Sequence, residues 1–140
     1  MFNDLVSHLH WLAILAGAAS YFVLGAIWYS NALFAKTWVK LLNIKMDDPD
    51  AKKGMVAMMA VSFVLMFVAS TGIGIIQQVL PAIDTMHAAK LGLLISIFFS
   101  VTSFSINYLY TRKPLMLYFI DGGYHVVGIV LSSIVIKLLS

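Results

Sequence analysis

The chain has 140 residues, of which 61% are apolar and 11% charged, and its formal net charge is +3. A soluble domain is about half apolar and about a quarter charged, and a chain this short has too much surface to hide such an excess of apolar side chains. This composition excludes a disordered chain, argues against a soluble enzyme, and is typical of an integral membrane protein.

Four apolar runs are long enough to cross a bilayer as helices. They cover residues 9–29, 55–80, 88–110 and 115–139, and each approaches or exceeds the roughly 20 residues that span the hydrocarbon layer. A helix satisfies its own backbone hydrogen bonds, which lipid cannot do. We therefore predict an all-α bundle of four transmembrane helices, forming a single integral membrane domain over residues 1–140.

A short amphipathic segment follows the first run. Residues 32–42 place apolar side chains at helical spacing, with Lys36 and Lys40 on the other side. This pattern predicts an interfacial helix, although a plain continuation of the first span is the alternative. Four residues are expected to anchor this region at headgroup depth, with headgroup or substrate binding as the alternative role: Trp28, Tyr29, Lys36 and Trp38.

The hydrophilic segment before the second run contains a helix-start pattern. Asp48 is a candidate N-cap, Pro49 suits the first helical position, and Asp50 suits the first turn. The second helix is therefore expected to begin near Pro49 and to end at Pro81.

The basic residues predict the orientation. One connection carries Lys36, Lys40, Lys45, Lys52 and Lys53, and the connection between the third and fourth runs carries Arg112 and Lys113. The positive-inside rule places these loops, and the interfacial helix, on the cytoplasmic side, with both termini outside the cytoplasm. A bacterial inner membrane is the expected location. The basic residues form no continuous basic face, which argues against nucleic-acid binding.

Polar residues inside the last two runs are the candidate functional residues. The fourth run carries a stripe at helical spacing: Tyr118, Asp121, His125, Gly128 and Ser132. The third run carries a matching stripe: Gly92, Ser96, Ser100, Ser103, Asn107 and Tyr110. Asp121 and His125 are one turn apart and within reach of each other.

We expect Ser103 and Asn107 to lie across from Asp121 and His125. Two interpretations stay open: a proton-responsive pair or cation site on a polar pathway, or a satisfied polar clasp between two spans.

Catalysis and metal binding have weak support in the sequence. The chain has no cysteine, and no convincing nucleophile or acid–base set stands out. The Asp121 and His125 pair lacks the third ligand of a metal site. His8, His10 and Asp4 are explained more simply as residues at the membrane surface. We expect neither an enzyme nor a metal or cofactor.

Two segments resemble a family of small bacterial membrane proteins known as domain of unknown function 1761. They are Gly25-Ala26-Ile27-Trp28-Tyr29-Ser30, continuing through Leu33-Phe34-Ala35-Lys36 to Trp38, and Asn107-Tyr108-Leu109-Tyr110 with Gly123-Tyr124-His125-Val126-Val127. The resemblance implies the four-span layout, with Asn107 and Tyr124 as buried polar partners, and it brings no activity. Asn31 and Ala35 stand where the family commonly has Pro and Gly.

The favoured function is a small transporter or channel for an ion or small solute. Four short spans enclose little internal volume, so we expect a homo-oligomer that contacts itself through the small-residue faces of the first and third spans. Membrane lipid is the other expected partner. The alternative is an accessory or structural subunit that binds a larger membrane complex.

Overall fold

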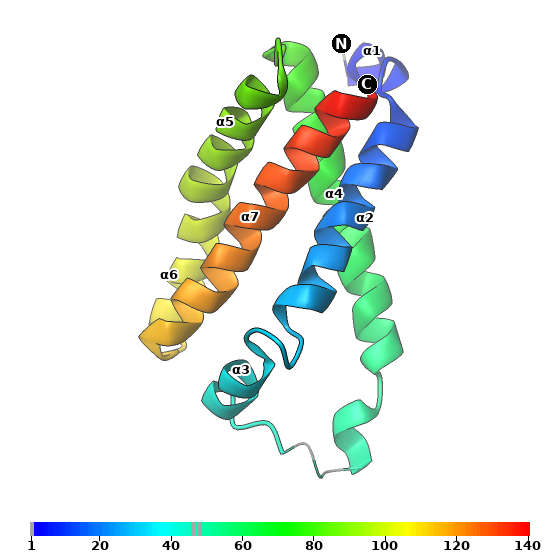
Figure 1. The fold of residues 1–140 in the computed structure, drawn as a ribbon. Coiled ribbons are helices and arrows are strands. Elements are labelled where there is room, and N and C mark those ends of the chain that lie inside the picture. The colour runs from blue at the N-terminus through cyan, green and yellow to red at the C-terminus, as the bar shows by residue number, and fades with distance from the viewer. Residues whose placement is uncertain (1, 46, 48) are drawn as a thin grey trace.

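A computed structural model describes residues 2–45, 47 and 49–140, and within that part of the chain all regular structure is helical. This confirms the all-α prediction. In chain order, the helices are α1 (Phe2–Ser7), α2 (Trp11–Trp28), α3 (Ala35–Leu41), a 3-10 turn η1 (Pro49–Lys52), α4 (Met55–Val79), α5 (Thr85–Ile95), a π-helical turn η2 (Ser96–Val101), α6 (Thr102–Tyr110) and α7 (Leu115–Leu139) (Figure 1).

Four of these segments are long and apolar enough to cross a membrane: Trp11–Trp28, Met55–Val79, Thr85–Tyr110 and Leu115–Leu139. The third span is one continuous rod built from α5, η2 and α6. It begins a few residues before the predicted start, because Asp84 caps it by accepting a hydrogen bond of 2.8 Å from the backbone N–H of His87. The chain thus has the layout of a multi-pass membrane protein.

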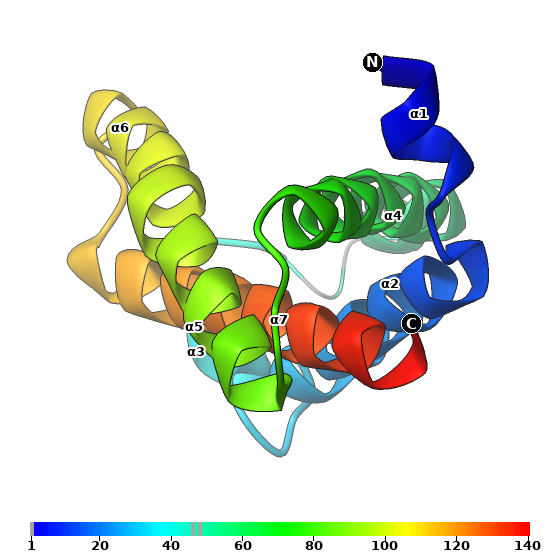
Figure 2. The same ribbon diagram turned by 90° about the horizontal axis from the view of Figure 1, so that it is seen from above.

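α7 is the central helix of the bundle. It packs against α2 on one side and against α5 on the other, and α4 packs mainly against α2 (Figure 2). Half of α7 is buried inside the protein, whereas α4 and the third span are mostly exposed. The polar residues of α7 are therefore the ones most surrounded by protein.

Glycines bring the helices close to α7. A Cβ on Gly92 of α5 would lie 2.9 Å from the Val130 Cα, and a Cβ on Gly17 of α2 would lie 2.8 Å from the Ser132 hydroxyl oxygen. The small-residue faces of the first and third spans therefore pack against α7 of the same chain. The parts of these faces around Gly17 and Gly92 are therefore occupied within one chain, and association between copies stays a prediction.

Both basic connections lie at one end of the bundle and both termini lie at the other (Figure 1). This arrangement follows from four antiparallel spans. Which end faces the cytoplasm stays a prediction from the positive-inside rule.

α3 is a separate helix. The chain turns between Trp28 and Ala35, so α3 does not continue α2, and the continuation alternative is wrong. The turn is fixed by aromatic contacts: the rings of Trp28 and Phe34 are 5.1 Å apart, and those of Tyr29 and Trp38 are 5.4 Å apart. Lys36 is exposed, as expected of an anchor.

The second transmembrane helix begins at Met55 and not near Pro49. Pro49 instead starts the short turn η1, and Gly54 separates that turn from α4 with a φ of +78°. This left-handed backbone favours glycine and breaks helical continuity. The predicted N-cap, Asp48, lies outside the described residues.

Candidate functional site

A buried carboxylate lies at the centre of the end of the bundle that is nearest α3. Asp121 projects from the first half of α7 and is 7% exposed. Its Oδ1 accepts a hydrogen bond of 2.6 Å from the Tyr29 hydroxyl, and its Oδ2 accepts one of 2.5 Å from the Tyr108 hydroxyl. Each oxygen therefore has its own donor, one from the end of α2 and one from α6. Hydrogen bonds to an ionised group are the strong ones in proteins.

His125 lies one turn further along α7 and has a tyrosine of its own. Its Nδ1 is 2.5 Å from the Tyr21 hydroxyl of α2. The rings of Tyr124 and Phe104 lie 5.0 Å and 5.8 Å from the imidazole. Within the described part of the chain, His125 shares no hydrogen bond with Asp121. The two groups are neighbours on one helix, each held by tyrosine.

Tyr118 and Trp28, which are also predicted functional residues, lie beside the cluster of Asp121, His125 and their tyrosine partners. Tyr118 is half-buried, and its ring lies edge-on to Tyr108 at 5.4 Å without reaching Asp121. The indole N–H of Trp28 donates a 3.0 Å hydrogen bond to the Ile120 carbonyl. Trp28 and Tyr29, predicted as headgroup anchors, thus also bind α7 directly.

Ser103 and Asn107 do not face Asp121 and His125. Both are exposed on the outside of the bundle, and Phe104 and Tyr108 occupy the expected places. The same finding corrects the expectation that Asn107 is a buried polar partner, whereas Tyr124 is buried as expected.

The physical reason is the π-helical turn η2. A π turn pairs residue i with i+5 and so holds one residue more than an α-helical turn. Every residue after Val101 is therefore rotated by about 100° compared with an uninterrupted α-helix. As a result, Phe104 and Tyr108 face the bundle interior in place of Ser103 and Asn107, the residues that precede them.

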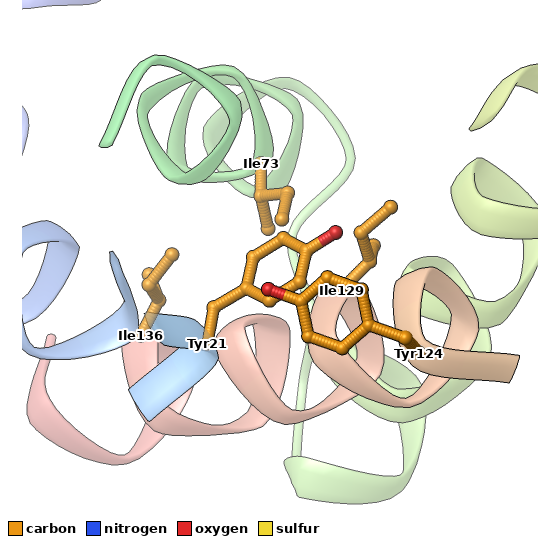
Figure 3. Packing of buried hydrophobic residues seen from close by; sticks show 5 residues of the cluster. All are labelled: Tyr21, Ile73, Tyr124, Ile129 and Ile136. Carbon is orange, nitrogen blue, oxygen red and sulfur yellow. The ribbon is translucent and has the colours of Figure 1, made fainter. Parts of the chain in front are cut away.

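A cleft of 610 Å³ opens beside His125. It lies between α4 and the third span, because α4 packs against α2 and α7 and does not pack closely against the third span. Its wall is mostly apolar, with polar atoms from Tyr21, Ser62, Ser100, Tyr124 and His125. Tyr21 and Tyr124 lie ring against ring below Ile73 of α4, 5.3 Å between centroids (Figure 3). A second cleft of 470 Å³ shares Ser62, Met66 and Tyr124 with it and extends toward α3.

The opposite half of α7 is held by neutral groups. The Ser132 and Ser70 hydroxyls are 2.9 Å apart, and the Gln77 amide donates to Ser133, whose hydroxyl donates to the Ala88 carbonyl. His8 and His10 line a further cavity near the termini. No group of three or more metal-ligating side chains occurs among the described residues.

Sequence reasoning missed the tyrosines as partners. The sequence predicts Tyr29 as a headgroup anchor and includes Tyr108 only in the family motif, and it assigns no role to Tyr21. One feature of the sequence could have indicated them. A carboxyl group inside a span needs hydrogen-bond donors, and a tyrosine near the end of a span can direct its hydroxyl toward the bundle interior as well as toward the membrane surface.

A family model described as a protein of unknown function, DUF1761, matches residues 12–137. The match includes Asp121, His125 and their three tyrosine partners and all four spans except Trp11, Leu138 and Leu139 at their outer ends. No curated protein and no solved structure matches the chain.

Proposed function

Because this chain belongs to the DUF1761 family of proteins of unknown function, we propose a role from the geometry of its site: transport of an ion or small solute across the membrane. The observation that carries the proposal is the position of His125. Its ring lines the 610 Å³ cleft on one side and is bonded to Tyr21 on the other, one turn from the buried Asp121.

The cleft has the properties of a small-solute site. Sites for small molecules commonly measure about 300–1,000 Å³ and are mostly apolar, with a few polar groups that fix orientation. This cleft falls in that range, and its polar groups are hydroxyls and one imidazole. The apolar lining favours a small, partly apolar solute over a bare ion.

The titratable groups next to the cleft supply a way to couple binding to protons. Neutral imidazole has one donor and one acceptor nitrogen, and protonated imidazole has two donors. When His125 gains a proton, its Nδ1 can only donate, so the Tyr21 hydroxyl must accept or turn away. The change at Tyr21 would be felt in the cleft, which Tyr21 also lines.

The complete transporter in this proposal is a homo-oligomer in the bacterial inner membrane, with the basic end in the cytoplasm. A single copy leaves the cleft open between α4 and the third span. A neighbouring copy placed against this side would complete a wall around the solute. Exposed apolar residues of α4, such as Val64, Leu65 and Val68, are available for that contact.

The second candidate is an accessory subunit of a larger membrane complex. The observation that favours it is the full satisfaction of Asp121, whose two oxygens each accept a hydrogen bond from tyrosine. A dry clasp of this kind needs no water and no solute. In that case the exposed apolar faces would be committed to a different protein.

Water access separates the two candidates. The chain contains no cysteine, so single Cys residues can replace the cleft residues Ser62 and Ser100, with the exposed residue Val23 of α2, which is outside the cleft and outside α4, replaced as the lipid-facing control. Each variant is reconstituted in liposomes and exposed to a charged maleimide. We expect labelling of S62C and S100C at least tenfold faster than of V23C. Equal, slow labelling at all three positions would overturn the transport proposal and leave the accessory subunit.

A further inference from the structure

We propose that the third span has two helical registers, and that the π turn η2 is the element that moves between them. In the observed register, Phe104 and Tyr108 face α7. In the second register the turn is α-helical, and Ser103 and Asn107 face α7 instead. The register change stands on its own observations, and its relevance to solute passage rests on the proposed transport function.

The sequence provides an inward-facing set for each register. Ser103 and Asn107 each directly precede one of the two residues that face α7 in the structure. With Gly92 and Ser96, both buried against α7, they continue one face of an uninterrupted α-helix. If η2 converts from π-helical to α-helical hydrogen bonding, the segment after it rotates by about 100°. This rotation brings Ser103 and Asn107 to the inward face.

The observed register leaves polar groups in an unfavourable place. Ser103 lies seven residues before the end of the span at Tyr110, about 10 Å along the helix, and its side chain is exposed on the surface that faces lipid. Asn107 is exposed on the same surface. Within the described part of the chain, neither side chain has a hydrogen-bond partner. Polar groups in a span usually face protein or water, and the second register places both there.

Each register gives Asp121 a donor. Tyr108 donates to Asp121 now, and Asn107 carries an amide N–H group that takes its position after the rotation. Because Asp121 keeps a donor in both states, the change does not leave its charge unpaired. A two-state element needs this kind of balance between its states.

The two registers place different side chains beside His125. Phe104 now packs against His125, with 5.8 Å between ring centroids, and its ring packs on Gly122, where a Cβ would lie 3.0 Å from the Phe104 Cζ. In the second register the small Ser103 replaces this ring. His125, which already lines the cleft, then has a hydroxyl in place of an aromatic ring on its other side, so the space beside it becomes larger and more polar.

Cysteine pairs distinguish the registers. G122C is combined with F104C to report the observed register, and with S103C to report the second one, in the full chain reconstituted in liposomes and treated with a bifunctional methanethiosulfonate, because the Phe104 ring separates the two backbones by more than a disulfide spans. We expect both pairs to crosslink, the F104C pair faster. If the S103C pair crosslinks no faster than G122C paired with the outward-facing I106C, the two-register proposal is overturned.

Deleting Phe98, an exposed residue of η2, removes the extra residue of the π turn. An uninterrupted α-helix then places Phe104 and Tyr108 toward α7, as in the observed register. In this background we expect the F104C pair to crosslink as before and the S103C pair to fall at least fivefold. An undiminished S103C signal contradicts the proposal.

Two point variants test the same idea without a deletion, in case the deletion variant does not fold. Y108F removes the donor of the observed register and should raise S103C crosslinking. N107L removes the donor of the second register and should lower it, leaving the F104C pair unchanged. If neither variant shifts the ratio, the proposal fails. The two proposals can fail separately. If the crosslinks show both registers but maleimide never labels the cleft, the transport proposal is contradicted and the two-register proposal stands.

Discussion

The two halves of α7 both contain polar side chains that need hydrogen-bond partners inside the bundle, and they obtain these partners in different ways. Toward the termini, Ser132 and Ser133 are held by the hydroxyl of Ser70, the amide of Gln77 and a backbone carbonyl. Toward α3, Asp121 and His125 are held by three tyrosines. Both halves satisfy polar groups inside a span, but the hydrogen-bonded side chains toward the termini are hydroxyls and an amide, whereas those toward α3 include an acid and an imidazole.

The difference in partners also sets the space between helices. Short side chains and glycine bring backbones together, as at Gly92, and leave no room beside Ser133. Tyrosine reaches its partner across a full ring, so its hydrogen bonds to Asp121 and His125 do not require the backbones to approach as closely as they do at Gly92. Clefts open beside His125 and Tyr29 in this half. We call the half of α7 toward the termini the closed half, because it is closely packed around Ser133, although a cavity lies at its end beside Gln77 and Lys137; the half toward α3 is open beside His125.

The largest expected effect is on the closed half. Leucine at Gly92 meets the backbone of Val130, where even a Cβ would lie 2.9 Å from the Cα, and backbone cannot move aside easily. We expect G92L to lower the free energy of unfolding by about 3 kcal/mol, the upper part of the range for overpacking. Unfolding in mixed micelles, followed by tryptophan fluorescence, measures this.

The matched control is G72L, because a Cβ on Gly72 meets no atom within 4 Å. It should change stability by less than about 0.5 kcal/mol. Equal losses in both variants would show that the contact of α5 with α7 is not close, and the contrast between the two halves would fail.

An intermediate effect compares single hydrogen bonds of the two halves. Y108F leaves one carboxylate oxygen of Asp121 without its donor, and a hydrogen bond to a charged group contributes about 1.5–3 kcal/mol. S70A removes a neutral bond to Ser132, and such bonds inside membranes average about 0.6 kcal/mol. The same unfolding assay should rank Y108F as the more destabilising variant. The reverse order would mean that the hydrogen bond from Tyr108 to Asp121 contributes less to stability than the one between Ser70 and Ser132.

The smallest effect lies outside both halves and depends on pH. Asp84 caps α5, and the hydrogen bond from the backbone N–H of His87 lowers the pKa of its carboxyl below the usual value. A lowered pKa in the folded state stabilises the fold above the unfolded pKa of about 4, and this stabilisation is lost as pH falls through the folded pKa.

The variant D84N keeps a capping side chain but cannot ionise. It should lower Tm slightly at pH 7, and this difference should shrink as pH falls below the unfolded pKa of about 4. A Tm difference that is independent of pH would show that capping matters and the charge does not.

The sequence predicts the spans well because span length is set by bilayer thickness and composition. It also places Asp121 and His125 on the buried face of α7, since acid and imidazole side chains avoid lipid. It does not predict the π turn, because residues 96–101 are ordinary helix formers in a membrane. One unrecognised extra residue then misplaces Ser103 and Asn107. The tyrosine partners escape prediction because they come from distant parts of the chain, and their inward direction depends on packing.

The unequal lengths of the helices have a consequence for the surrounding bilayer. α2 has 18 residues and α4 has 25, so they are about 27 Å and 37 Å long, on either side of a hydrocarbon thickness of about 30 Å. Lipids next to α2 must thin and those next to α4 must stretch, or α4 must tilt. The hydrophobic boundary is therefore shorter at α2 than at the other three spans, which have 25 or 26 residues, and we expect the bilayer to thin locally beside α2.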